Sequence, residues 1–273
     1  MPPPGQEQLL APSELHARFS TRYAPVHWGE RLPSAAEITQ LYGAKATARS
    51  LRLLERTIST EPRITAQFLA AMPPSASAYR LERRIKSPES LARKLHDMQR
   101  SRQRHPPDDL LRYTALTEVP DTLVDAARET CEELSQAGWQ IRYAKQSYAE
   151  GSRYKGIHGY FVTPSDDRVE VQFHSVASVQ VKEATTPWYE IDRDARSSPE
   201  ERTAARRECV RLSATLREPP GIWTLTDLGG LRVAVSNYSD HREPANAPAG
   251  VRSSDSRGAP QALTPTRSDG IGR

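Results

Sequence analysis

The chain has 273 residues, of which 26% are charged and 37% hydrophobic, and its mean hydropathy is −0.68. No window approaches the roughly 18 consecutive apolar residues of a membrane-spanning helix. The only cysteines, Cys131 and Cys209, are too far apart for a disulfide scaffold or a structural zinc cluster. The start of the chain lacks a basic segment followed by an apolar one, so no secretory signal peptide is predicted. We therefore expect a protein that acts in the cytoplasm and has no membrane partner.

The net charge of +4 is unevenly spread along the chain. Residues 80–104 carry nine Lys and Arg against three acids, and residues 106–140 carry eight acids against two arginines. Residues 141–158 are basic again. Basic segments on both sides of an acidic one suit a compact polyanion held beside a metal-binding carboxylate. Solvated helix faces with ion pairs would give the same counts, so both interpretations stay open here.

The N-terminal third divides into three stretches. Residues 1–33 are rich in proline and poor in aliphatic side chains, so we predict an irregular arm. Residues 34–72 have apolar residues at helical spacing, and Pro62 separates two predicted helices there. Residues 79–86 are predicted to be extended.

The rest of the chain predicts alternating helices and strands. Capping residues and amphipathic spacing predict helices over 87–103, 120–137 and 198–216. Runs of β-type residues predict strands over 110–118, 139–144, 157–163, 168–174 and 231–236. A turn at 164–167 predicts that the two strands beside it form a hairpin. The chain after Tyr238 is rich in Ser, Pro, Gly and Arg without periodicity, so residues 238–273 are predicted to be a disordered tail.

Four cation or hydroxyl side chains could form a cradle for a polyanion. Arg84 and Lys86 are two apart in the predicted extended run and would share one face. Ser90 and Lys94 are four apart in the following helix and would also share a face. The helix N-terminus adds unpaired N–H groups that favour phosphate. No glycine-rich P-loop is present in the sequence.

Two carboxylates could complete this site. Asp109 lies at the start of a predicted strand, where a carboxylate near phosphates suits Mg²⁺; an ordinary loop-end acid is the alternative. In the strand 168–174, Glu170, Gln172 and His174 alternate with apolar residues and form a polar stripe. The stripe could face water, or Glu170 could join Asp109 at a metal or accept a hydroxyl proton.

Together these motifs resemble those of one enzyme family. The order R-I-K-x-x-x-S-x-x-x-K, D-x-x-R, Y-K-G-I-H and E-V-Q-F-H is similar to that of RelA/SpoT-type nucleotidyltransferase domains, and Trp188-Tyr-Glu resembles compact, toxin-like members. The resemblance implies an α+β fold with a nucleotidyltransferase-like mixed β-sheet flanked by helices. It implies a single catalytic domain with N-terminal helices over 34–237, with its motifs within 80–175.

The resemblance also implies roles for particular residues. The ATP triphosphate is held by Arg84, Lys86, Ser90 and Lys94. Mg²⁺ is bound by Asp109, and Glu170 joins it or activates the attacking 3′-hydroxyl. The acceptor would be bound by Tyr154, which would stack on its base, and by His158, Lys145, Gln172 and Arg112.

Two positions depart from the family pattern near the acceptor. Arg112 comes three residues after the metal aspartate, where the family has a glycine and then an arginine five residues on. Ser152-Arg153 stands where the family often has Asn-Gly. Both departures lie near the expected acceptor pocket and leave the donor motifs unchanged. The pair His96-Asp97 lacks the partners of a hydrolase module, so we expect synthesis without hydrolysis.

The expected activity is an Mg²⁺-dependent transfer of the β,γ-pyrophosphate of ATP to the 3′-OH of a purine nucleotide, which yields (p)ppGpp- or (p)ppApp-like alarmones. One alternative is a toxin that pyrophosphorylates the 3′ end of tRNA, with Arg100, Arg102, Arg104 and Arg142 as a basic surface. Another is a non-catalytic nucleotide- or RNA-binding module. A neutralising antitoxin as partner, and delivery as a secreted effector, stay open.

Overall fold

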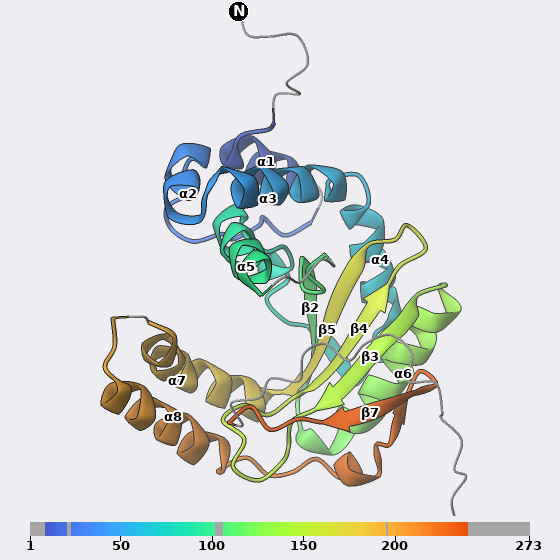
Figure 1. Cartoon of the computed structure of the whole chain (residues 1–273). Coiled ribbons are helices and arrows are strands. Elements are labelled where there is room, and N and C mark those ends of the chain that lie inside the picture. The colour runs from blue at the N-terminus through green and yellow to red at the C-terminus, as the bar shows by residue number, and fades with distance from the viewer. Residues whose placement is uncertain (1–8, 21–22, 102–105, 195, 240–273) are drawn as a thin grey trace, which may run out of the picture. The chain divides into compact units, whose positions relative to one another are not determined.

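The computed structural model of the protein describes residues 9–20, 23–101, 106–194 and 196–239 (Figure 1). The helices in these ranges are α1 (Pro12–Phe19), α2 (Ala35–Tyr42), α3 (Ala44–Thr57), α4 (Glu61–Ala71), α5 (Pro88–Arg100), α6 (Leu123–Gln136), α7 (Val176–Arg193) and α8 (Pro199–Ser213). The strands are β1 (Ala76–Ala78), β2 (Leu111–Thr117), β3 (Gln140–Gln146), β4 (Ile157–Val162), β5 (Arg168–Ser175), β6 (Asp227–Leu228) and β7 (Leu231–Val235). All five predicted strands are therefore confirmed to within a few residues.

The strands form one mixed sheet in the order β1-β2-β5-β4-β3-β7-β6. The pairs β2–β5 and β3–β7 are parallel, and the other pairs are antiparallel. Strand β5 lies between β2 and β4, and β4 and β5 form the predicted hairpin. An α+β fold with a mixed sheet flanked by helices is thus confirmed.

One face of the sheet is apolar and carries the main core. Strand register aligns apolar side chains across four strands in the row Leu111, Val169, Phe161 and Ile141. Helix α4 contributes Phe68, which stacks on Tyr113 of β2 with ring centres 4.7 Å apart. Helix α6 packs against β2, β3 and β5 and buries its apolar stripe, including Cys131. The prediction that Cys131 is a core residue is confirmed.

The opposite face carries two rows of polar and aromatic side chains. The first row is Arg112, Glu170, Tyr160 and Tyr143. The second row is Thr114, Gln172, His158 and Lys145. On β5 these side chains are buried, since Glu170 and Gln172 are each 5% exposed. The polar stripe therefore does not face water, and its functional role stays a prediction.

Helix ends follow the sequence signals. Ser87 caps α5 by accepting a hydrogen bond from the Ser90 N–H at 3.2 Å, and Pro88 occupies the first helical position. Helix α6 ends at Gln136 and is followed, after its cap Ala137, by Gly138, which adopts a φ of +85°. The Trp139 N–H returns to the Leu134 carbonyl at 2.9 Å, which closes a Schellman turn.

Two predictions for the N-terminal third of the chain are wrong: the irregular arm and the number of helices in residues 34–72. Residues 12–19 form helix α1 and are not irregular, because Leu15 and Phe19, four apart, bury one helical face in the core. The stretch 34–72 contains three helices, since Gly43, with a φ of +82°, separates α2 from α3 in addition to the break before α4. Residues 240–273, which hold nearly all of the predicted tail, lie outside the described residues.

Candidate functional site

The centre of the polar face is the carboxylate of Glu170. Its Oε1 accepts hydrogen bonds from His158 Nδ1 at 2.8 Å, Tyr160 Oη at 3.1 Å and Gln172 Nε2 at 3.2 Å. The donors come from β4 and β5, and strand register places them beside Glu170. Three donors on one buried oxygen fix the carboxylate in a single orientation.

The protonation states of this pair follow from burial and charge. Burial alone would raise the pKa of Glu170, but the hydrogen bond from His158 and the charge of Arg112 hold that pKa below its usual value. Burial lowers the pKa of His158 despite the opposing effect of Glu170. A neutral His158 therefore donates its Nδ1–H to an ionised Glu170. Its Nε2 is then a buried acceptor, and no partner for it occurs within the described ranges.

A second carboxylate, Asp109, lies just before β2 with two lysines around it. Lys86 Nζ is 2.9 Å from Asp109 Oδ2, and Lys94 Nζ is 2.6 Å from Oδ1. Burial would raise the pKa of Asp109, but the two lysines lower it further, so the carboxylate is charged. The structure brings Lys86, Lys94 and Asp109 together as the sequence predicted. Ser90 lies in the first turn of α5, one turn before Lys94.

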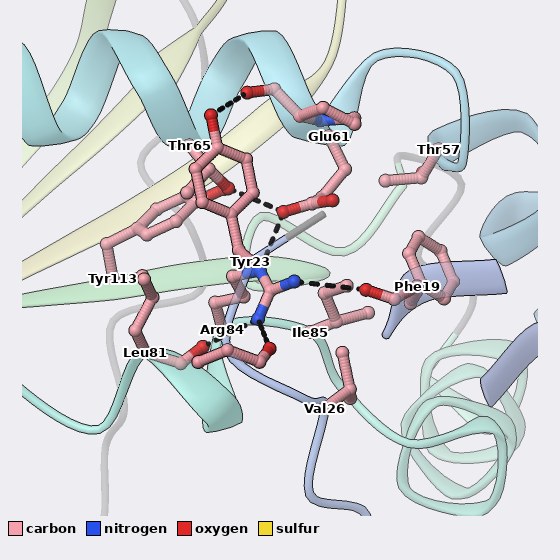
Figure 2. Close-up of polar contacts among 12 residues, drawn as sticks. Phe19, Tyr23, Val26, Thr57, Glu61, Thr65, Leu81, Arg84, Ile85 and Tyr113 are labelled. Carbon is pink, nitrogen blue, oxygen red and sulfur yellow. Dashed lines mark hydrogen bonds and ion pairs between the residues drawn. The ribbon is translucent and has the colours of Figure 1, made fainter. Parts of the chain in front are cut away.

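Arg84 does not belong to this site, contrary to the prediction (Figure 2). Its side chain is fully buried, and its Nε donates to Glu61 Oε1 at 2.6 Å. Its Nη1 and Nη2 donate to the carbonyls of Ala24 at 2.8 Å and Phe19 at 3.2 Å. Arg84 ends a 3₁₀ turn with φ −64° and ψ −20°, so the two-residue periodicity assumed for Arg84 and Lys86 does not apply.

The buried Arg84 instead anchors the segment that carries Lys86. Glu61 also accepts a hydrogen bond from Thr65 Oγ1 at 2.5 Å, and that hydroxyl lies 2.8 Å from Tyr113 Oη (Figure 2). These contacts connect α4 and β2 to Arg84. The Arg84 carbonyl accepts from the Arg112 N–H at 2.8 Å, and Lys86 N–H donates to Leu110 at 3.0 Å. The ion pair therefore fixes the backbone next to Asp109.

The acceptor-side residues of the prediction also meet on the polar face. Tyr154 Oη lies 2.7 Å from His174 Nε2, and the Tyr154 ring centre is 5.5 Å from that of His158. Gly156 permits this packing, because a Cβ there would lie 2.8 Å from the His174 ring. Lys145 Nζ lies 4.7 Å from the ring centre of Tyr238. The base-stacking role of Tyr154 stays a prediction.

Two residues near this cluster were not identified from the sequence. Lys182 Nζ, on α7, lies 3.0 Å from Gln172 Oε1 and 5.9 Å from the Tyr154 ring centre. Tyr238 follows β7, and its ring centre lies 5.3 Å from that of Tyr154. The capping box at Ser175 and Ser178 is the sequence signal that could have located α7.

The carboxylates of this site could hold a magnesium ion only if phosphates and water completed its coordination shell. Over the ranges that the structure describes, no three His, Cys, Asp or Glu side chains are close enough to hold a metal. Asp109 is partly exposed, with a hard carboxylate that already faces two cations. Mg²⁺ commonly takes one or two carboxylates and completes its shell with phosphates and water. Asp109, with Glu170 nearby, fits that pattern.

No helix in the described ranges is long and apolar enough to cross a membrane.

Comparison with known proteins gave similar structures but no similar sequences. No protein-family model matches the chain, and no curated protein matches it. The complex between the Type VI effector Tas1 and its immunity protein contains a similar chain, with 17% identity and a TM-score of 0.35, over 63% of this chain and 96% of the other. A GTP pyrophosphokinase family protein from Streptococcus pneumoniae shares 17% identity with a TM-score of 0.34, over 66% and 87%.

Proposed function

We propose that the protein transfers the β,γ-pyrophosphate of ATP to the 3′-hydroxyl of a purine nucleotide. The observation that carries the proposal is a pair of ionised carboxylates: Asp109, which pairs with Lys86 and Lys94 near the N-terminus of α5, and Glu170, which is close enough for its charge to act on Asp109. A protein that only binds nucleotides has little use for two acids beside a phosphate site. The sequence motifs that resemble RelA/SpoT-type domains support the same reaction.

The donor triphosphate binds at the Asp109 end of the polar face. Lys86 and Lys94 supply two ammonium groups, and the first turn of α5 with Ser90 supplies N–H groups and the positive end of the helix dipole. Bound Mg²⁺, held by Asp109 and the phosphates, would neutralise charge on the transferred group. Lys86 and Lys94 then turn from Asp109 toward the phosphate oxygens.

The acceptor hydroxyl is activated at Glu170. Its carboxylate accepts the 3′-OH proton while the oxygen attacks the β-phosphorus of ATP, and the bond between the β-phosphorus and the α,β-bridging oxygen breaks to release AMP. His158, Tyr160 and Gln172 keep the carboxylate aimed and stabilise its negative charge before the reaction. The His158 Nε2 is free to accept a hydrogen bond from the acceptor.

The donor assignment predicts a selective binding defect. Lys94→Met removes one of two ammonium groups at the phosphates, so the KM for ATP should rise by about tenfold to a hundredfold. The KM for the acceptor should stay within twofold. Steady-state kinetics with each substrate varied in turn measures both. Arg93→Met, at the neighbouring position of α5, is the matched control; equal effects of the two variants would contradict the assignment.

The reaction itself is tested with γ-labelled ATP and a panel of acceptors. Wild-type protein is incubated with GDP, GTP, ADP, ATP or deacylated tRNA, and the labelled product is separated. We expect label on a free purine nucleotide. Label on tRNA would support the alternative of a tRNA-modifying toxin, and label on no acceptor would support a binding module and overturn the proposal.

A further inference from the structure

Lys182 is a cation that the proposed reaction does not yet use. It lies on α7, which begins directly after β5 and packs back against that strand. Its ammonium group contacts Gln172 Oε1 at 3.0 Å, and the ring centre of Tyr154 lies 5.9 Å away. Lys182 therefore sits over the second polar row of the sheet, beside the residues assigned to the acceptor.

We propose that Lys182 binds a free phosphate group of the acceptor, so that the acceptor is a nucleoside di- or triphosphate. The inference rests on the proposed transfer reaction and specifies its second substrate. It assigns to α7 a part of the site that the sequence motifs do not contain.

The position of Lys182 separates it from the donor lysines. Lys86 and Lys94 contact Asp109, which precedes β2 and lies before the first polar row. Gln172, which Lys182 contacts, is two residues beyond Glu170 along β5, a displacement of about 7 Å. Glu170 thus lies between the two cationic groups. A donor on one side and an acceptor on the other would present the 3′-hydroxyl near this carboxylate.

The charge around Lys182 favours an anion. Within the ranges described, Lys182 makes no ion pair, and its hydrogen-bond partner Gln172 is neutral. The adjacent Glu183 is directed elsewhere, toward Arg80 and Tyr79. Burial, followed by the charge of Arg112, lowers the pKa of Lys182 to about 8. Glu170 and Glu183 act on the Lys182 charge only at longer range, and a phosphate would provide the direct ionic partner that Lys182 lacks within the described residues.

The unpartnered Nε2 of His158 lies in the same row as Gln172 and supports a ligand at this place. A buried acceptor atom without a partner is costly, and a hydroxyl or amino group of the acceptor would satisfy it. The terminal nucleotide of a tRNA offers only a phosphodiester with a single charge. A free nucleoside diphosphate carries more charge for Lys182, so the geometry favours a free nucleotide.

Calorimetric titrations separate phosphate binding from catalysis. The full chain is saturated with Mg²⁺ and α,β-methylene-ATP and then titrated with guanosine and GDP, or with adenosine and ADP. We expect one diphosphate to bind at least tenfold tighter than its nucleoside. Lys182→Met should reduce that advantage by about tenfold to a hundredfold, with the affinities for the nucleoside and for α,β-methylene-ATP within twofold of wild type. Lys182→Arg should restore most of it.

Arg193→Met, at the far end of the same helix, is the matched control and should change none of these affinities. Equal binding of nucleoside and diphosphate by wild type, or an equal loss of α,β-methylene-ATP and diphosphate binding in Lys182→Met, would overturn the inference. Label transfer by the wild type is scored separately. A Lys182-dependent phosphate preference without transfer would retain the anion site and reject the proposed reaction. Transfer that is unaffected by Lys182→Met would retain the proposed reaction and reject the anion site at Lys182.

Discussion

Glu170→Gln should lower the turnover number for pyrophosphate transfer by about 10²–10⁴-fold. The substitution keeps the shape of the side chain but removes the group that accepts the 3′-OH proton. It also removes the negative charge that three donors are arranged to hold. Turnover is measured with both substrates saturating, by the release of AMP from labelled ATP.

The control for Glu170→Gln is Glu183→Gln, an exposed acid on α7, which should retain wild-type turnover. The melting temperature and the affinity for α,β-methylene-ATP are measured for both variants, to show that the site remains folded. Turnover by Glu170→Gln within threefold of wild type would remove Glu170 from the mechanism.

Glu61→Ala should destabilise the protein by about 3–5 kcal/mol, because it leaves the guanidinium of Arg84 buried without its counter-charge. The loss also frees Thr65 Oγ1 from its acceptor (Figure 2). Urea unfolding followed by circular dichroism measures the change. The double variant Glu61→Leu/Arg84→Met replaces both charges with apolar groups and should recover much of the stability.

An exposed ion pair provides the comparison for Glu61→Ala. Asp121 pairs with Arg217 at the surface, so Asp121→Ala should change the unfolding midpoint very little. A similar small shift for Glu61→Ala would show that the buried pair does not stabilise the fold. Since Arg84 anchors the backbone of Lys86, the apolar double variant should also bind ATP more weakly than wild type.

The sequence was sufficient for five of the seven strands of the sheet and for the grouping of several candidate site residues. Alternation along β5 identified Glu170, Gln172 and His174 as one stripe, and a strand keeps such side chains on one face whatever surrounds it. The four-residue spacing from Ser90 to Lys94 was also reliable, because the cap at Ser87 and Pro88 defines the helix.

Arg84 shows where local periodicity is insufficient. Its direction depends on a left-handed residue, Arg80 at φ +48°, and on a short 3₁₀ turn, neither of which the sequence pattern signals. Its partner Glu61 lies 23 residues away on another helix. Only the tertiary structure distinguishes this buried ion pair from a phosphate-binding arginine.

Lys182 was missed for a related reason. Helix α7 faces a polar site, so few of its residues are buried apolar ones, and Pro187 interrupts the helical pattern. A helix without an apolar stripe has no periodic signal to detect. Its contact with Gln172 spans ten residues and arises because α7 returns along β5.

The central claim is a transfer of pyrophosphate as one unit, and matched product measurement tests it most directly. ATP labelled at the α-phosphate and ATP labelled at the γ-phosphate are incubated in parallel with the preferred acceptor. We expect one AMP for each acceptor that gains the label from the γ-position, and loss of both products in Glu170→Gln. Formation of ADP with transfer of a single phosphate, or AMP with free pyrophosphate and an unmodified acceptor, would contradict it.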